Sequence, residues 1–442
     1  MSPLPQFEAS QAFALQLDQQ DPLASFPHQF YNPLDLHGNP ALYLCGNSLG
    51  PQPRTTQRYV QQVMDQWRSL GVRGHFNGEQ PWTTYVHQLI PLIAPLLGAQ
   101  EAEVVPMGTL TENIHLLLAA FYSPRGQRNK ILALGGGFPS DRYALESMLA
   151  VKGLAPQEHI LYAAPEPGEF LYPPELFSNL LQTYGQQIAL VFLPAVHFAT
   201  GQAFNLEQIT QAAHTQGCLV GFDLAHAAGN IPLQLHNWGV DFAAWCGYKY
   251  LCSGPGNGGG IYVHARHSQQ PDLLHLAGWW GNSLNTRFEM RTNFEPVLTA
   301  ERFQVSNPAV LPLAGLLAAL ELYHAAGMER IWEKSRKLTA YLEYLLGTNA
   351  GADQPGNAQQ YFRILTPAHP DQRGNQISIQ VKGDVLKIAA ALLEAGVVID
   401  ERPPNIIRVA PMPIFNRYLE VWQFARIFKR VLLDINERPI GN

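Results

Sequence analysis

The sequence contains few cysteines, and none of them forms a paired motif. Its 442 residues include four cysteines, at positions 45, 218, 246 and 252, and no two are spaced as C-x-x-C. Isolated cysteines inside apolar stretches are typical of reduced thiols. We therefore expect a chain that folds with neither disulfides nor a bound metal.

Long apolar runs are also absent. No stretch approaches the roughly 20 apolar residues that a transmembrane helix requires. The N-terminal segment MSPLPQFEASQAFALQLDQQDPL lacks the basic region followed by an apolar region that marks a signal peptide. The sequence therefore predicts a cytoplasmic protein that does not bind a membrane.

Clusters of basic residues are missing as well. The chain has 29 Lys and Arg against 35 Asp and Glu, which gives a formal net charge of -6. A nucleic-acid-binding surface normally shows a basic patch or stripe. We therefore do not expect nucleic acid as a partner.

What the sequence does contain is apolar residues in two distinct patterns, one helical and one typical of buried strands. Helical spacing is found in residues 55–70 and again in residues 82–97. From Lys130 onward, short apolar runs alternate with segments long enough for helices, a rhythm that indicates a parallel sheet. These runs are KILAL, HILYAA, IALVFLP, CLVGFD and DFAAWC.

The alternation predicts an α/β fold in which a mostly parallel central sheet is flanked by helices. A long helical region after Ser306, followed by QISIQV, DVLKIAAALLEAG and IIRVAP, predicts a smaller C-terminal α+β domain. We expect an N-terminal arm over residues 1–60 that packs on the small domain, a large domain over 61–305 and the small domain over 306–442. Open α/β sheets bind ligands beyond the carboxyl ends of their strands, so the site is expected there.

Lys249 follows one of these predicted strands. A lysine at the end of an apolar strand can lose ammonium hydration, which lowers its pKa and frees the amine to attack a carbonyl. Lys249 therefore suits a Schiff base. A solvated surface lysine after a buried strand is the alternative.

Asp223 stands at the carboxyl end of another predicted strand, close to His226. A carboxylate there can keep a pyridinium nitrogen protonated. The alternatives are an ordinary helix N-cap for Asp223 and a hydrogen-bonded helix residue for His226.

The segment GTLTENIHLLL begins a predicted helix with Gly108 and Thr109. Free amides and hydroxyls at a helix N-terminus can hold a phosphate. A threonine cap paired with Glu112 explains the same residues without a ligand.

The segment GGGFPSD at residues 135–141 presents Phe138 in a loop after a predicted strand. An aromatic ring in this position can stack on a flat cofactor. A simple turn capped by Ser140 or Asp141 is the alternative, and neither a Walker motif nor G-x-G-x-x-G fits the segment. Taken jointly, the motifs suggest pyridoxal phosphate.

Longer segments of the chain resemble the kynureninase family. They are YLCGNSLGPQP, FPSDRYALES, DLAHAAGNIPLQLHNWGVDFAAWCGYKYL, GWWGN and RVAPMPIFN. The resemblance extends from about Tyr43 into the C-terminal domain. It implies the fold type I, transferase-like architecture of enzymes that depend on pyridoxal 5′-phosphate, in a homodimer with shared active sites.

The resemblance also implies a reaction and the residues that serve it. The reaction is hydrolysis of the bond between the β and γ carbons of L-kynurenine, or of its 3-hydroxy analogue, to anthranilate or 3-hydroxyanthranilate and L-alanine, a step in tryptophan degradation and NAD biosynthesis. Catalytic roles fall to Lys249, Tyr248 and Asp223. Further contacts to the cofactor are implied for Leu110, Thr111, Phe138, Pro139, Ser140, Asp141, His226, Trp279 and Asn307, and contacts to the substrate for Arg408, His75, Asn307 and Ser48.

The chain departs from the family pattern in two places. Pro194 stands where the family often has a hydroxyl residue, and CSGPGNGGG is one residue longer than the usual glycine run. The sequence leaves two rival functions: a cysteine desulfurase-like lyase of the same fold, and a protein that binds pyridoxal phosphate without turnover. Cys252 lies too close behind Lys249 to suit the first, and the joint presence of Lys249, Asp223, Tyr248 and Arg408 argues against the second.

Overall fold

The structure is a computed structural model that describes residues 6–348 and 357–437. The ends of the predicted arm and of the predicted C-terminal domain, and residues 349–356, lie outside the described residues. The chain divides into two compact units. The sheet unit consists of Thr56–Phe198 and Phe204–Glu321, and the terminal unit consists of the chain up to Thr55, Ala199–Ala203 and the chain from Leu322 onward.

The sheet unit is built on a seven-stranded sheet with the strand order β2-β8-β7-β6-β5-β3-β4. Strands β3 to β7 are mutually parallel, whereas β8 runs antiparallel to both β7 and β2. The mostly parallel sheet is therefore confirmed. The strands are β2 (Val104–Met107), β3 (Lys130–Leu134), β4 (Ile160–Ala163), β5 (Ile188–Pro194), β6 (Leu219–Asp223), β7 (Phe242–Cys246) and β8 (Gly259–Val263).

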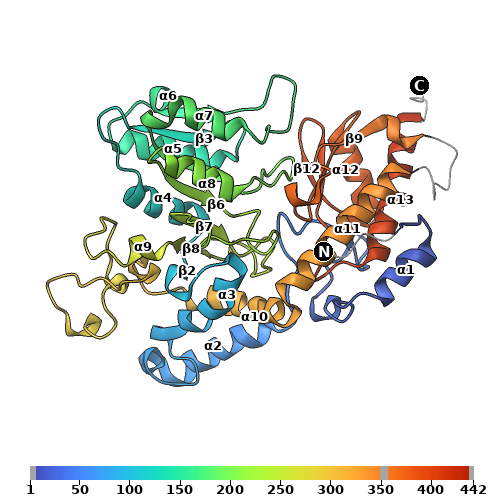
Figure 1. Cartoon of the computed structure of the whole chain (residues 1–442). Helices are drawn as coiled ribbons and strands as arrows, with labels where there is room; N and C mark the ends of the chain where they lie inside the picture. The colour runs from blue at the N-terminus through green and yellow to red at the C-terminus, as the bar shows by residue number, and fades with distance from the viewer. Residues whose placement is uncertain (1–5, 349–356, 438–442) are drawn as a thin grey trace. The chain divides into compact units, whose positions relative to one another are not determined.

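The five strands expected from the apolar runs are β3 to β7, and β2 and β8 were not foreseen. The residues of β3, β5, β6 and β7 are mostly buried, as expected for parallel strands covered on both faces. Alternate residues point to opposite faces, so Ile131 and Ala133 pack against α4 and α5 in one core. Figure 1 shows α4, α5, α7 and α8 beside these strands.

The helices of the sheet unit connect the strands and precede them. Part of the expected helix over residues 82–97 is a 3-10 helix, because a proline at the second position of the following α-helix cannot donate the hydrogen bonds of a continuous one. The helices are α2 (Thr56–Leu70), η2 (Gly71–His75), η3 (Trp82–Gln88), α3 (Ile90–Leu97), η4 (Glu101–Glu103), α4 (Leu110–Phe121), α5 (Pro139–Val151), α6 (Pro156–His159), α7 (Leu176–Tyr184), η5 (Gly185–Gln187), α8 (Leu206–Thr215) and α9 (Ala265–Ser268).

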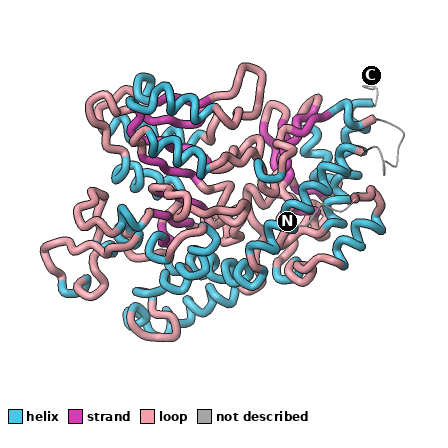
Figure 2. The backbone as a smooth tube through the Cα atoms, in the orientation of Figure 1, coloured by secondary structure: helices cyan, strands magenta, loops and turns pink. Residues whose placement is uncertain are grey.

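Between α9 and α10 (Val310–Ala326), the chain forms short 3-10 turns and loops, drawn mostly as pink tube in Figure 2. The buried guanidinium of Arg302 donates hydrogen bonds to the backbone carbonyls of Ser268 at 3.1 Å, Gln270 at 2.6 Å and Leu273 at 3.2 Å. One side chain thus holds a loop that has little secondary structure. The turns are η6 (Trp279–Gly281), η7 (Arg287–Glu289) and η8 (Ala300–Phe303).

The terminal unit contains a four-stranded antiparallel sheet in the order β12-β13-β10-β9, together with the parallel pair β1 and β11. The long helical region expected after Ser306 breaks at Gly327, whose φ of +76° is left-handed. The elements are η1 (Pro27–Gln29), α1 (Gln11–Gln19), β1 (Leu42–Tyr43), α11 (Met328–Gly347), η9 (Ala358–Tyr361), β9 (Phe362–Ile364), η10 (Pro370–Gln372), β10 (Ile377–Val381), α12 (Val385–Glu394), β11 (Val397–Val398), β12 (Asp400–Arg402), β13 (Ile406–Val409) and α13 (Tyr418–Glu437).

The N-terminal helix α1 packs on α13 within the terminal unit. The Asp18 carboxylate accepts the backbone N–H groups of Tyr418 at 2.7 Å and of Leu419 at 3.2 Å, so it caps the N-terminus of α13. The indole of Trp422 donates to the carbonyl of Ala9 at 3.0 Å.

No single helix among the described residues is long and apolar enough to cross a bilayer. Helices α10 and α11 satisfy the length and composition criteria only when they are counted together across their break.

Candidate active site

A cavity of about 320 Å³ opens at the carboxyl ends of the parallel strands. Strands β3, β5, β6 and β7 all end near it because parallel strands direct their carboxyl ends to the same edge of the sheet. Residues that line the cavity include Thr109, Leu110, Thr111, Phe138, Ser140, Pro194, Phe198, Asp223, His226, Tyr248 and Lys249. The structure thus brings together most of the predicted site residues of the sheet unit.

Lys249 lies just beyond the end of β7 and projects into this cavity. Its Nζ is 3.3 Å from Nε2 of His226, and it lies 5.9 Å from the centre of the Phe138 ring and 5.7 Å from that of Tyr248. The strand before it is fully buried, so the start of the loop is fixed. The lysine is half-buried among aromatic groups and is not a solvated surface residue.

Asp223 and Asp141 form a buried carboxyl pair beside the lysine. Burial raises the pKa of Asp223, and the Lys249 ammonium opposes this shift. Burial and the adjacent Asp223 raise the pKa of Asp141 well above its usual value. Because two close carboxylates cannot both ionise easily, Asp141 holds a proton and Asp223 carries the charge.

Asp223 also accepts the N–H of Ala225 at 2.7 Å. Asp223 is thus the last residue of β6, and its carboxylate also accepts the hydrogen bond of the turn that follows the strand. Both Asp141 oxygens are buried, and the proton on Asp141 supplies a hydrogen bond to Asp223.

The N-terminus of α4 forms one wall of the cavity. The carboxylate of Glu112 accepts the backbone N–H and the hydroxyl of Thr109, each at 2.8 Å, so the capping pair expected as an alternative is present. The next residues, Leu110 and Thr111, line the cavity at the positive end of the helix. Capping and anion binding are therefore compatible here.

Glycines bring two chain segments together at this wall. Gly108 has a left-handed φ of +48°. A Cβ on Gly258 would lie 2.3 Å from the carbonyl oxygen of Gly108. The close approach accounts for glycine in the long run that follows Lys249.

Phe138 is the residue before α5, and its side chain is 43% exposed at the cavity. Its ring meets that of Phe198 edge to face at 5.3 Å, a neighbour that the sequence did not identify. Pro139 is the first residue of α5, and Ser140 lines the cavity in the same turn.

Burial raises the pKa of Tyr248, so its phenol stays protonated.

Pro194 lines the cavity at the end of β5, where it pairs in register with Asp223. The proline brings neither a hydroxyl nor an N–H to this wall. The departure noted in the sequence therefore falls inside the site.

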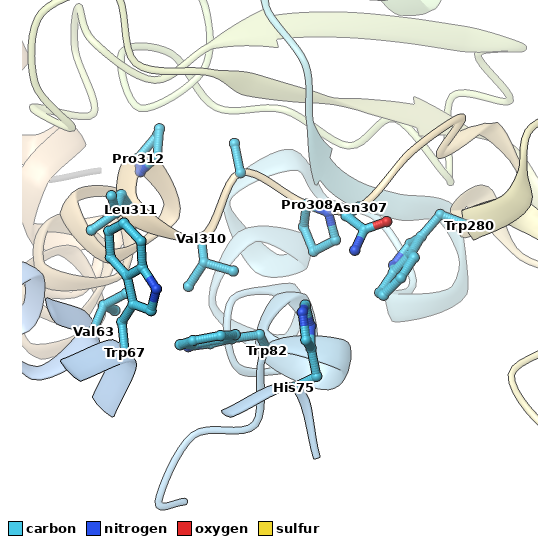
Figure 3. A pocket seen from close by; sticks show the side chains of 11 residues that line it. Val63, Trp67, His75, Trp82, Trp280, Asn307, Pro308, Val310, Leu311 and Pro312 are labelled. Atoms are coloured by element: carbon cyan, nitrogen blue, oxygen red, sulfur yellow. The ribbon is translucent and has the colours of Figure 1, made fainter. Parts of the chain in front are cut away.

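A second cavity of about 370 Å³ in the sheet unit contains His75 and Asn307. Trp82 and Trp280 line it as well, and Figure 3 shows these four side chains around one space. The His75 and Trp82 rings meet edge to face at 5.2 Å. The sequence did not identify either tryptophan as a site residue.

Trp279 does not line either of these two cavities. It is 42% exposed, and its indole N–H donates to the carbonyl of Arg287 at 3.0 Å. The adjacent Trp280 points into the second cavity instead. Nothing in the sequence distinguishes the two neighbouring tryptophans.

Arg408 and Ser48 belong to the terminal unit. Arg408 lies on β13 and is 2% exposed, and its side chain forms an ion pair with Asp400. The backbone N–H of Ser48 donates to the carbonyl of Cys45 at 3.0 Å, in the turn after β1.

Solved structures with the same fold define the class of protein. A structure of the lyase C-DES with glycine covalently linked to its PLP cofactor aligns with a TM-score of 0.72 at 20% identity, over 91% of this chain and 98% of that one. The cysteine desulfurase of Thermococcus onnurineus aligns with a TM-score of 0.70 at 17% identity, over 91% and 97%. The fold is that of the fold type I enzymes that use pyridoxal phosphate.

Sequence relatives then give the family. The kynureninase of Koribacter versatilis is 43% identical over 96% of this chain and 98% of its own length. That of Myxococcus xanthus is 44% identical over 95% and 97%, and that of Xanthomonas campestris is 45% identical over 94% and 96%. The family model of the kynureninase C-terminal domain matches residues 331–428. The chain belongs to the kynureninase family.

Proposed function

We propose that this protein is a hydrolase that cleaves the bond between the β and γ carbons of L-kynurenine, with pyridoxal 5′-phosphate as its cofactor. Water supplies the hydroxyl of the new anthranilate carboxyl group, and the β carbon takes a proton and becomes the methyl group of L-alanine. One observation carries the proposal: in a member of the kynureninase family, the amine of Lys249 lies in a cavity beside a buried carboxyl pair. The reaction belongs to tryptophan degradation, and it can also serve NAD biosynthesis.

The residues of the first cavity fit pyridoxal phosphate. Lys249 supplies a primary amine for the aldehyde, and Asp223 supplies a buried anion for the pyridine nitrogen. The start of α4 offers Leu110 and Thr111 to the phosphate. When bound, the cofactor supplies an electron sink for charge that develops on the carbons of the substrate.

The ring of the cofactor would be held between the groups at the carboxyl ends of the strands. Phe138 offers an exposed aromatic face for stacking, and Nε2 of His226 contacts the Lys249 amine at 3.3 Å. Pro139, Ser140 and Asp141 fix the turn that carries Phe138. Asp223 would keep the pyridine nitrogen protonated, because a buried anion favours a neighbouring cation.

Lys249 and Tyr248 move the protons. With the cofactor bound, Nζ of Lys249 would take the proton from the α carbon of the substrate as a general base. Tyr248 remains protonated because burial raises its pKa, so its hydroxyl can deliver the proton that the β carbon needs. The two residues are adjacent in the chain and line the same cavity.

Recognition of the substrate is assigned to four residues. Arg408 presents a planar guanidinium, which suits the α-carboxylate, and Ser48 is a further substrate contact. His75 and Asn307 line one cavity with two tryptophans, which suits an aromatic ring with a polar substituent. They are the residues proposed to rank kynurenine against its 3-hydroxy analogue.

We further propose a homodimer that shares its active sites, with Trp279 and Asn307 reaching the cofactor of the partner subunit, and a cytoplasmic location. A complementation experiment tests the sharing. Chains carrying Lys249→Ala and chains carrying Trp279→Ala are each expected to be inactive, and mixing them after mild dissociation should restore activity. No recovery in mixtures that exchange subunits would contradict shared sites.

The activity itself is tested by fluorescence. Purified holoprotein is incubated separately with L-kynurenine and with 3-hydroxy-L-kynurenine, and release of the fluorescent anthranilates is followed. We expect turnover of at least one, and the ratio of kcat/KM ranks the two. Pyridoxal phosphate binding without any product would favour a non-catalytic protein, and sulfur release from cysteine would favour a desulfurase.

A further inference from the structure

A carboxylate and two imidazoles meet at one place in the sheet unit, away from both cavities described above. Glu103 precedes β2, His264 follows β8, and His236 lies in the segment before β7. Their ligand atoms all lie within 4.8 Å of one another. We propose that these three residues form a binding site for a divalent transition-metal ion, with Zn²⁺ as the best match.

The cluster is separated from the proposed active site by the length of a strand. Strand β8 is antiparallel to β7, so its last residue, Val263, pairs with Phe242 at the start of β7. Lys249 follows the opposite end of β7. Five residues at about 3.3 Å each place the two sites roughly 16 Å apart along the strand.

Glu103 is a buried carboxyl group that has neither a lysine nor an arginine as an ion-pair partner among the described residues. Its side chain is 0% exposed, and among the described residues its ion pairs are with His236 and His264 and with no lysine or arginine. Buried carboxylates are generally paired with a cation or bound to a metal. A metal ion would supply the missing positive charge.

The neighbouring Asp241 shows the contrast. It also gathers two histidines, His214 at 2.9 Å and His267 at 2.6 Å. There, however, the guanidinium of Arg266 forms an ion pair with the carboxylate. The Asp241 cluster therefore has its cation already, and the Glu103 cluster does not.

The carboxylate of Glu103 is held in a fixed orientation. Oε1 accepts the N–H of Ala265 at 2.9 Å, and Oε2 accepts the N–H of Gln100 at 2.9 Å. Hydrogen bonds of this kind orient the carboxylate ligands of metals. Each oxygen keeps a second lone pair, so a metal bond at Oε1 is compatible with both contacts.

His236 is placed as a ligand with its own support. Its Nδ1 is 2.9 Å from Glu103 Oε1, and its Nε2 is 3.0 Å from the side-chain amide of Gln100. If Nδ1 binds the metal, the Gln100 amide, whose oxygen accepts the backbone N–H of Glu103, turns to present that oxygen to the Nε2–H group. Histidine ligands usually donate their second N–H in this way.

His264 completes the set. Its Nδ1 lies 3.4 Å from Glu103 Oε1 and accepts the N–H of Arg266 at 3.2 Å. Since that nitrogen is an acceptor, it cannot also donate to Glu103, and two electron-rich atoms face each other. Coordination through Nδ1 would replace the bond to Arg266 and turn this apposition into an attraction.

The donor set determines the class of metal. Two imidazoles and one carboxylate suit Zn²⁺, which takes His₂Glu ligand sets with water in the fourth position. The His236 side chain is 33% exposed and that of His264 is 14% exposed, so solvent can reach the site. A bound metal would link the residue before β2, the segment before β7 and the residue after β8, and it would thereby stabilise the folded state.

Calorimetric titration of untagged, chelator-treated holoprotein with ZnCl₂ tests the proposal. We expect saturable binding of one equivalent. His236→Ala, which removes a partly exposed ligand, should lower the affinity at least tenfold, and Gln100→Ala, which leaves all three ligands in place, by about tenfold. His214→Ala is the matched control, because it removes a histidine from the Asp241 cluster, and it should bind Zn²⁺ as tightly as the unaltered protein.

Thermal unfolding gives an independent readout. Zn²⁺ should raise the unfolding midpoint of the unaltered protein and of His214→Ala, and the rise should be lost in His236→Ala. Should His236→Ala fold poorly, the Gln100→Ala titration decides the matter. Absence of a one-equivalent isotherm, or equal affinity in all of these variants, would overturn the site.

Discussion

Arg408 meets Asp400 through two parallel contacts, Nε to Oδ1 at 2.9 Å and Nη2 to Oδ2 at 2.7 Å. Both side chains are nearly buried, at 2% and 7% exposure, and Arg402 adds a contact to Oδ1 at 2.7 Å. A bidentate pair fixes the plane of a guanidinium. Asp400 is therefore positioned to orient Arg408, the proposed anchor of the substrate carboxylate.

Replacing Asp400 by asparagine should weaken substrate binding more than cofactor binding. The variant loses the charge that fixes the guanidinium, so we expect KM for kynurenine to rise about 10- to 100-fold with the pyridoxal phosphate content unchanged. Arg408→Lys should give a similar pattern, because a point charge replaces a planar fork. Steady-state kinetics and cofactor absorbance measure the two effects, and equal losses of both would contradict the assignment.

Lys249→Ala should abolish the covalent link to the cofactor. The unaltered protein is expected to be yellow and to bleach with borohydride, which reduces the imine between lysine and aldehyde. The variant should show neither the imine absorbance nor a reduced adduct on Lys249. An unchanged spectrum would remove Lys249 from its proposed role.

The carboxyl pair predicts unequal effects of two similar substitutions. Asparagine mimics a protonated aspartate, so Asp141→Asn should retain most of the activity. Asp223→Asn removes the charge facing the pyridine nitrogen and should lower kcat by about 100- to 1,000-fold. If Asp141→Asn proves the more damaging, the proton lies on the other member of the pair.

Asp241 links stability to pH. Burial alone would raise the pKa of Asp241, but hydrogen bonds from His214 and His267, together with Arg266, hold it below its usual value. A carboxyl group with a lowered pKa stabilises the folded state above its unfolded pKa of about 4, and this contribution is lost as the pH falls further.

Asp241→Asn should therefore destabilise the protein by about 2–3 kcal/mol at neutral pH. The difference from the unaltered protein should shrink below about pH 4, because Asp241 takes up a proton there in the unfolded chain while it stays ionised in the folded protein. Denaturant unfolding at several pH values measures it. A difference that stays constant down to acid pH would contradict this account.

The core strands and the order of the motifs could be predicted from the sequence. Runs such as KILAL and IALVFLP lie where β3 and β5 are found, because strands buried on both faces need uninterrupted apolar residues. Strands β2 and β8 were missed. Gly259 and Gly260 begin β8 and Pro106 lies in β2, and neither residue type favours a strand.

The candidate site divides in the same way. Lys249, Asp223 and Phe138 are recognisable because each stands just after a predicted strand or in its loop. The proton held by Asp141 was not foreseen, since it depends on how close the Asp223 carboxylate lies. Trp280 could not be chosen over Trp279 because the orientation of neighbouring side chains depends on the backbone of η6.

By itself, the sequence determined the strand rhythm, the candidate lysine and the family, because these depend on residue type and local order. Only the tertiary structure decided which charges meet. Glu103 and His236 are 133 residues apart in the chain, and backbone hydrogen bonds from Leu235 to Leu97 and from His236 to Gly98 bring the two segments together. Contacts between distant segments depend on strand register and burial, which no local spacing of residues encodes.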